Sequence, residues 1–215
     1  MALLSGGIDS PVAIHLMKER VEIVAVHFHQ MPLTDDTEIR KSKELAKALN
    51  VSKIYLVPFA PVLKALVDHY NHRHYYILSK IAMLRAAELI AKNENAQYLL
   101  TGENLAQVSS QTLSNLTTIT KNITMEVLRP VLTFDKQEII DIAKKIGTYD
   151  ISKGPEMCSL LGPKHPSTHS NSAEIAKELA TFNLLPLLEE SIAEAEIIVN
   201  QPGDTACWLT NSQPR

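Results

Sequence analysis

The residues best suited to chemistry lie almost at the start of the chain, where two glycines stand among small polar side chains. Residues 5–10 have the sequence Ser-Gly-Gly-Ile-Asp-Ser and separate a short apolar run, residues 2–4, from an amphipathic run, residues 12–20. Ser10 is predicted to be a helix N-cap, and Pro11 suits the first helical position, where its missing N–H costs nothing. Glycines let the backbone turn its N–H groups inward, and a helix N-terminus adds roughly half a positive charge. The stretch therefore predicts a strand, a glycine loop and a helix that together bind an anion.

This loop differs from the two commonest phosphate-binding loops, because it has neither the lysine of G-x-x-x-x-G-K-[ST] nor a G-x-G-x-x-G pattern. It resembles instead the PP-loop, SGGxDS, of the ATP pyrophosphatases. That resemblance implies that the loop binds the β,γ-pyrophosphate of ATP as a unit. It also implies cleavage between the α- and β-phosphates, which activates a substrate oxygen as an adenylate. An ordinary glycine-rich turn is the alternative, and the density of serine, glycine and aspartate disfavours it.

Apolar runs and amphipathic runs alternate along the chain and predict the elements that position the loop. The predicted strands are residues 2–4, 22–28, 53–59, 97–101 and 126–132. The predicted helices are residues 12–20, 35–49, two within 61–93, 107–116, 134–146, 171–182 and 184–199. Short βαβ connections require parallel strands, and ligands bind beyond the carboxyl ends of such strands. The fold class expected is a parallel-sheet, three-layer α/β/α fold of the Rossmann-like, adenine nucleotide alpha hydrolase-like type.

Length and composition limit the class of protein. With 215 residues, of which 45% are hydrophobic, the chain can form one substantial α/β domain, expected at residues 1–182, followed by a C-terminal helix and tail at 183–215. A net charge of −3 gives no global basic field for nucleic acid. Two cysteines, no signal peptide and no apolar membrane span indicate a cytoplasmic protein. Because the first strand has only about four residues before the loop, a fragment or a truncated relative is expected.

Three histidines, His69, His72 and His74, lie close together in a polar interruption of the 61–93 helical region. Helical spacing would place His69 and His72 on one face and invites a metal site. No nearby cysteine or glutamate completes a ligand set. A solvated or RNA-facing segment is therefore favoured over a metal site.

Several later stretches are similar to one family, the tRNA 4-thiouridine synthetases of the ThiI type, whose catalytic domain is a PP-loop ATP pyrophosphatase. The similar stretches are His27-Phe28-His29, residues 101–113 (TGENLAQVSSQTL), Leu128-Arg129-Pro130, residues 135–140, residues 146–149, Pro155-Glu156-Met157-Cys158 and residues 163–168. The resemblance extends from residue 2 to about residue 170, and the 101–113 run is specific to this family among PP-loop enzymes.

The resemblance implies that MgATP adenylates O4 of a tRNA uridine, with release of pyrophosphate. A persulfide sulfur then replaces the adenylated oxygen to give 4-thiouridine. The resemblance implies tRNA and a persulfide donor such as a cysteine desulfurase as partners, no membrane, and it also admits a homodimer. Asp9 would support Mg²⁺ or the leaving phosphates, and Lys80 stands where the family tends to have an arginine. The residues implied to bind ATP are Leu3, Leu4, Ser5, Gly6, Gly7, Asp9, Ser10, His27, Phe28, Lys80, Gly102 and Gln111.

Cys158 stands where the family has its catalytic cysteine, and the resemblance implies that it carries the sulfur. Lys153, Lys164 and His165 are near it in sequence and would lower the pKa of its thiol. A buried, inert cysteine is the alternative, but a Pro/Gly-rich loop is a poor place for core packing.

The sequence departs from the family in three respects. It has no ferredoxin-like and THUMP modules, no rhodanese domain, and no C-x-x-C partner for Cys158, which leaves Cys207 as the internal candidate for a second thiol. Two other functions stay open. One is a PP-loop adenylating ligase or amidotransferase for another substrate, and the other is a non-catalytic nucleotide-binding sulfur-relay partner.

Overall fold

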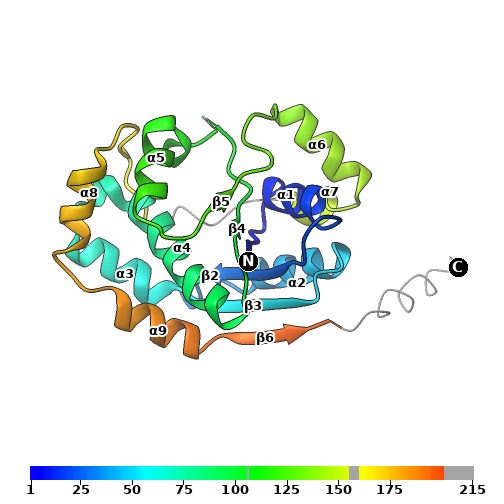
Figure 1. Ribbon diagram of the computed structural model, residues 1–215, viewed down its shortest axis with the longest axis horizontal. Coiled ribbons are helices and arrows are strands. Elements are labelled where there is room, and N and C mark those ends of the chain that lie inside the picture. Colours follow the sequence, from blue (N-terminus) through cyan, green and yellow to red (C-terminus); the bar gives the residue numbers. More distant parts are fainter. Residues whose placement is uncertain (106, 155–159, 201–215) are drawn as a thin grey trace, which may run out of the picture.

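A sheet of six strands forms the middle of the molecule (Figure 1). The computed structural model describes residues 1–105, 107–154 and 160–200 of the chain. The strands are β1 (Ala2–Leu3), β2 (Val24–His29), β3 (Lys53–Pro58), β4 (Leu99–Leu100), β5 (Val127–Leu128) and β6 (Glu196–Val199), in the spatial order β5-β4-β1-β2-β3-β6. The first five are parallel, as predicted, whereas β6 pairs with β3 in the antiparallel direction.

Helices cover both faces of this sheet, which confirms the predicted three-layer α/β/α architecture (Figure 1). One face carries α1 (Asp9–Met17), α2 (Thr37–Ala48), α6 (Lys136–Lys145) and α7 (Tyr149–Ser152). The other face carries α3 (Ala60–His69), α4 (Tyr75–Asn93), α5 (Leu113–Lys121), α8 (Ser172–Leu179) and α9 (Leu185–Ala193), with the short 3₁₀ helices η1 (His72–His74) and η2 (Ser109–Gln111). No helix in the described ranges has the length and apolar character needed to cross a membrane.

Strand β2 shows why the sheet needs both helical layers. Successive strand residues point to opposite faces. Val24, Val26 and Phe28 accordingly join the core under α3 and α4, while Ala25 joins the core under α1 and α2. A strand that is apolar on both faces is typical of a parallel sheet covered on both sides.

Two predicted helices differ from the structure. The helix predicted for residues 184–199 ends at Ala193, and residues 196–199 form β6 instead. Three consecutive β-branched residues, Ile197-Ile198-Val199, favour a strand, and β3 offers them an open edge. The helix predicted for residues 107–116 is replaced by η2 and by α5, because Thr112 caps α5 by accepting a hydrogen bond from the N–H of Asn115.

The histidine cluster has structural contacts. His69 stacks on Phe182 with ring centroids 4.1 Å apart, and His72 Nε2 lies 2.7 Å from the carbonyl oxygen of Leu161. His74 is buried and pairs with Glu178 at 2.7 Å, so this part of the predicted solvated segment is wrong. Within the described ranges, no group of three His, Cys, Asp or Glu side chains could hold a metal ion.

The order of the strands locates the ligand-binding edge. From β1 the chain proceeds to β2 and β3 on one side, and then returns to place β4 on the other side of β1. The carboxyl ends of β1 and β4 therefore flank a topological switch point, where open α/β sheets bind their ligands. The loop of residues 5–10 leaves β1 at this point, and Gly102 follows β4.

Gly102 touches the start of α1 so closely that no side chain fits. A β-carbon at residue 102 would lie 2.4 Å from the backbone nitrogen of Ser10 and 2.7 Å from the carbonyl carbon of Asp9. Both neighbours are backbone atoms of a buried helix terminus and cannot move aside cheaply. The glycine thus sets the distance between β4 and the N-terminus of α1.

Gly102→Ala should lower the free energy of unfolding by about 3 kcal/mol or more, the upper part of the range for overpacked sites. Gly147→Ala is the matched control. Gly147 has φ +74° but nothing within 4 Å of its β-carbon position, so the left-handed backbone alone should cost about 1 kcal/mol. Urea denaturation of both variants measures the difference, and equal losses would contradict the close approach at Gly102.

A hydrogen bond from His27 links β2 to the end of β1 at the same edge of the sheet. His27 Nδ1 lies 2.9 Å from the carbonyl oxygen of Leu4, which can only accept, so Nδ1 is the donor. Burial lowers the pKa of His27 from 6.5 to about 4, and the ring is neutral at pH 7.

The buried neutral His27 predicts a pH-dependent stability. Between pH 6.5 and 4 the unfolded chain takes up a proton that the folded ring excludes, so stability is present above pH 6.5 and is lost as the pH falls towards 4. The loss amounts to about 3 kcal/mol for this one group. In His27→Gln the fall in unfolding free energy between pH 7 and pH 4, measured with urea, should be smaller by that amount. An unchanged fall would show that His27 titrates normally.

Candidate functional site

The loop between β1 and α1 is closed by its own serines. The N–H of Ser5 donates to Ser10 Oγ at 2.9 Å, the two hydroxyl oxygens lie 3.0 Å apart, and the N–H of Gly7 donates to Ser5 Oγ at 3.3 Å. Gly6 and Gly7 are buried in this ring, while Ser5 is exposed. The loop is therefore a fixed cradle of main chain.

The predicted N-cap role of Ser10 is wrong. Ser10 is the second residue of α1, and the cap position belongs to Ile8, whose side chain has no oxygen to offer. The Ser10 hydroxyl bonds back to Ser5 instead. The first N–H groups of α1 thus receive no bond from a cap side chain and are available to an anion.

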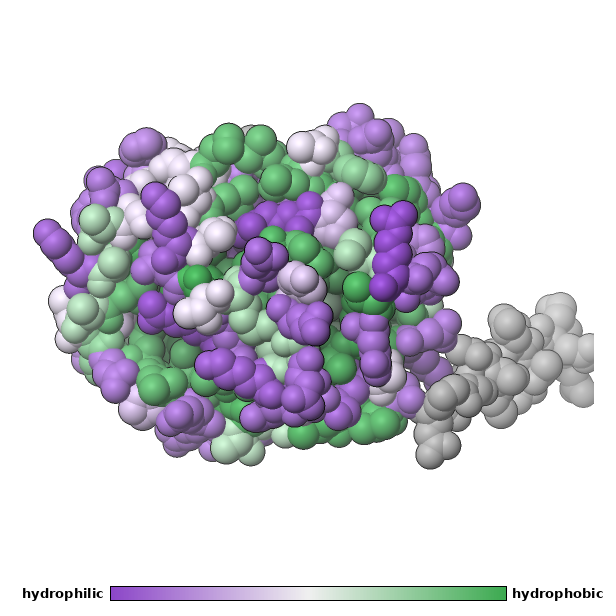
Figure 2. Space-filling view, viewed as in Figure 1, coloured by the Kyte–Doolittle hydropathy of each residue, from purple (hydrophilic) through white to green (hydrophobic). Residues whose placement is uncertain are grey.

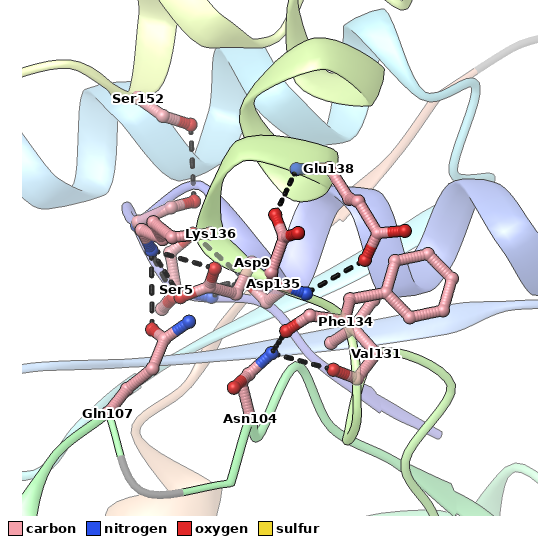
Figure 3. A network of polar contacts seen from close by, with 12 residues as sticks. Ser5, Asp9, Asn104, Gln107, Val131, Phe134, Asp135, Lys136, Glu138 and Ser152 are labelled. Carbon is pink, nitrogen blue, oxygen red and sulfur yellow. Dashed lines mark hydrogen bonds and ion pairs between the residues drawn. The ribbon is translucent and has the colours of Figure 1, made fainter.

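An ion pair stands at the mouth of this loop (Figure 3). Asp9, the first residue of α1, lies 2.9 Å from Nζ of Lys136, the first residue of α6, and Lys136 also donates to Gln107 Oε1 at 3.3 Å. The Asp9 side chain is 24% exposed and that of Lys136 is 49% exposed, so a ligand can reach both. The network joins the ends of three separate segments around one point.

The sequence holds Lys136 at this point through the start of α6 (Figure 3). Asp135 and Glu138 form a capping box, with each side chain accepting from the other residue's N–H at 2.8 Å. Asn104 Nδ2 donates to the carbonyl oxygens of Val131 at 2.8 Å and Phe134 at 2.6 Å, which ties this segment to the end of β4. The contacts orient the first turn of α6 towards the loop.

Lys136 is the functional candidate that sequence reasoning missed. A cation in the first turn of a helix opposes the helix dipole. The position of Lys136 in the first turn could therefore have indicated a functional residue, since a lysine there needs a nearby anion to stabilise it. No sequence pattern indicates the contact between Lys136 and Gln107, which are 29 residues apart.

Buried acceptors without donors lie along the same edge of the sheet. Within the described residues, His27 Nε2, Glu103 Oε1 and Gln111 Oε1 have no hydrogen-bond partner. Glu103 is held through its other oxygen, which accepts from Arg129 Nε at 2.8 Å. Because an unsatisfied buried acceptor costs about 1–3 kcal/mol, three of them indicate a ligand that brings donors.

The structure gathers some predicted site residues and leaves others apart. Pairwise contacts link several of them: His27 with Leu4, Ser5 with Ser10, and Gly102 with Ser10. Phe28 packs against Phe59, with ring centroids 4.7 Å apart. Gln111 ends η2, which lies against α4, the helix that carries the partly buried Lys80. Lys80 has no hydrogen bond or ion pair with any residue that the structure describes.

Cys158 lies outside the described residues, but the chain on either side of it is fixed. Before it, Ser152 Oγ donates to the carbonyl oxygen of Gly7 at 3.1 Å, next to the loop. After it, the carbonyl oxygen of Leu161 bonds to His72, and the backbone of Gly162 lies against the Tyr76 ring, where a β-carbon would be 1.9 Å from the hydroxyl. The flanking residues thus lie on opposite faces of the sheet.

Hydrophobic side chains gather near the segment between β4 and α5. Figure 2 shows hydrophobic surface over the upper edge of the molecule, where that segment lies. Leu105, Val108 and Leu113 are 36%, 55% and 64% exposed. Exposed apolar side chains beside a polar edge are typical of a binding surface.

Known proteins are similar to this chain in sequence and in fold. The family model described as thiamine biosynthesis protein ThiI matches residues 1–184. A probable tRNA sulfurtransferase from Moorella thermoacetica is 37% identical over 209 residues, which are 94% of this chain and 54% of that protein. The crystal structure of a 4-thiouridine synthetase–RNA complex with bound ATP has 35% identity and a TM-score of 0.87, covering 93% of this chain and 54% of that one. NMN synthetase from Francisella tularensis, at 15% identity, is similar in fold, with a TM-score of 0.57 and coverage of 81% and 71%.

The chain spans about half the length of the tRNA sulfurtransferase and the 4-thiouridine synthetase that it matches. The family predicted from the SGGIDS loop and the 101–113 run is confirmed. With a model match over residues 1–184 of 215, this chain belongs to the ThiI family.

Proposed function

We propose that this chain is the catalytic part of an ATP-dependent tRNA sulfurtransferase. It adenylates O4 of a tRNA uridine, position 8 in the family, and releases pyrophosphate; a persulfide sulfur then replaces the adenylated oxygen to give 4-thiouridine. The observation that carries the proposal is the loop closed by Ser5 and Ser10 at the uncapped start of α1. The names of the two relatives with 35% and 37% identity support it.

The site fits ATP. Gly6 and Gly7 are buried in the loop and carry no side chains that could cover its main chain, and the start of α1 favours negative charge. His27 Nε2, a neutral acceptor without a donor, suits an amine or hydroxyl of adenosine. Gln111 Oε1 is a second acceptor of this kind.

The residues fit Mg²⁺ only as a companion of the phosphates. No described cluster provides three protein ligands, and Asp9 is shared with Lys136. Mg²⁺ is commonly held by one or two carboxylates plus substrate phosphates and water. Asp9 would supply one oxygen, the metal would neutralise phosphate charge, and Lys136, released from Asp9, would turn to a phosphate oxygen.

In the second half-reaction Cys158 carries the sulfur. The terminal sulfur of its persulfide bonds to C4 of the activated uridine, and AMP leaves with the C4–O4 bond electrons. A second thiolate then attacks the Cys158 sulfur, so that a disulfide forms and the 4-thiouridine thiolate departs. That thiol is Cys207 or a thiol of the persulfide donor, for which a cysteine desulfurase is the expected class.

The tRNA should bind weakly to this chain alone. Phosphate contacts supply most non-specific affinity for nucleic acid, and the net charge of −3 provides no general attraction. Assays therefore need low salt and high tRNA concentration.

Asp9→Ala should abolish pyrophosphate release from MgATP in the presence of unmodified tRNA. It should change the free energy of unfolding by no more than about 1 kcal/mol, because partly exposed ion pairs contribute little to stability. Asp68→Ala, which breaks an exposed pair with Lys64 on α3, is the matched control and should keep full activity. Normal turnover by Asp9→Ala would remove the loop from the mechanism.

Cys158→Ser should separate the two half-reactions. Its hydroxyl can carry no terminal sulfur and is not ionised near neutral pH, so the variant should consume ATP with tRNA yet form no 4-thiouridine from a persulfide donor. Excess sulfide should restore thiolation, because it attacks the adenylate directly.

Three outcomes contradict parts of this proposal. Full thiolation of Cys158→Ser with the persulfide donor would exclude the carrier role. Adenylation of a different acceptor would identify a PP-loop ligase or amidotransferase. A wild-type chain that binds ATP but releases no pyrophosphate with tRNA would identify a sulfur-relay partner. Cys207→Ser, tested in parallel, reports whether the second thiol is internal.

A further inference from the structure

Lys41 of α2 packs against Gly6 of the SGGIDS loop and reaches the chain that leads to Cys158. A β-carbon at Gly6 would lie 3.5 Å from Cδ of Lys41 and 3.8 Å from its Cβ. A β-carbon at Gly154 would lie 3.3 Å from its Nζ. The aliphatic stem therefore packs against the loop, and the ammonium group stands beside Gly154.

The ammonium of Lys41 has no hydrogen bond or ion pair with any residue in the described ranges, although the side chain is partly buried. Within the same ranges, several other lysines, unlike Lys41 and Lys80, have carboxylate partners. Lys43 pairs with Glu196, Lys53 with Glu94 and Lys153 with Asp150. Among the described residues, no carboxylate compensates the positive charge that Lys41 brings into contact with the loop.

The charge balance of the loop shows what this lysine can do. Asp9 and Lys136 cancel each other, so together they offer no net charge to a ligand. ATP carries several negative charges, of which a bound Mg²⁺ neutralises two. A free ammonium group is a compact charge with three donors, which suits phosphate oxygens.

We propose that Lys41 binds the pyrophosphate portion of ATP and the pyrophosphate that leaves. This proposal rests on the proposed function, because it assigns a phosphate ligand to the same loop. The stem packs on Gly6 of the loop, and Nζ lies beside Gly154, where the absence of a side chain leaves space open. Gly154 has φ +123°, a conformation in which a side chain is strained, so this space is retained.

The test compares Lys41→Met with Lys41→Arg and with Lys43→Met. Methionine keeps an unbranched stem on Gly6 and removes only the charge, whereas Lys43→Met removes a charge from the same helix and breaks an exposed pair with Glu196. Calorimetry measures the binding of MgATP, magnesium pyrophosphate and AMP to each variant. AMP is the discriminating ligand, because it lacks the β- and γ-phosphates.

Lys41→Met should bind MgATP and pyrophosphate about tenfold to a hundredfold more weakly, the loss expected for one charge-assisted contact, and should bind AMP as the wild type does. Lys41→Arg should recover part of the affinity, and Lys43→Met should match the wild type. Unchanged pyrophosphate affinity in Lys41→Met overturns the proposal. An equal loss for AMP overturns it too, since that result indicates a distorted loop.

One more measurement tests the main alternative role of Lys41, which is activation of the Cys158 thiol. In a Cys207→Ser background, the pH profile of iodoacetamide alkylation reports the Cys158 thiol. A profile that shifts in Lys41→Met while pyrophosphate binding stays constant overturns the proposal in favour of thiol activation. If Lys41→Met binds pyrophosphate more weakly but the wild-type chain makes no 4-thiouridine, the sulfurtransferase function is refuted and the role of Lys41 in phosphate binding stands. A wild-type chain that binds neither ATP nor pyrophosphate refutes both.

Discussion

The contact between Gly102 and the first turn of α1 is the constraint on which the rest of the site depends. Only a residue without a β-carbon allows the end of β4 to approach the backbone of Asp9 and Ser10 this closely. That approach places Glu103 and Asn104 directly after it at the carboxyl end of β4, and Asn104 in turn holds the segment before α6. Lys136 then reaches Asp9. The absence of a β-carbon at residue 102 thus sets the positions of four functional candidates on three segments, Asp9, Glu103, Asn104 and Lys136.

The site is built at some expense of stability. The first turn of α1 has a cap residue, Ile8, that cannot satisfy its N–H groups, and a serine that could do so bonds to the loop instead. Among the described residues, His27 Nε2 and Gln111 Oε1 are buried and have no hydrogen-bond donor. Each departure leaves a polar group ready for a ligand. The apolar layers on both faces of the sheet supply the compensating stability.

Local patterns predicted the parts of the fold that depend on local physics. The loop with its two glycines, the parallel strands and the helix of residues 134–146 followed from turn chemistry and periodicity. The errors arose where a contact with a residue far away in the sequence determines the local structure. Residues 196–199 continue an amphipathic pattern, but the open edge of β3 selects a strand. Serine is a favoured N-cap residue, but the hydroxyl of Ser10 is hydrogen-bonded to that of Ser5. The pairing of Lys136 with Asp9 joins residues 127 positions apart, and no single-chain pattern encodes such a contact.

The central position of β1 has a consequence for folding during synthesis. Ala2 pairs with Ala25 on one side and with Leu100 on the other. The first pairing is local and can form early, whereas the second waits until β4 has left the ribosome. Until then the middle of the sheet presents an open strand edge, which is a template for pairing with other chains. Non-local parallel pairing of this kind folds slowly. The nascent chain is therefore most exposed to aggregation between the synthesis of β1 and that of β4, before the site at the ends of these strands can exist.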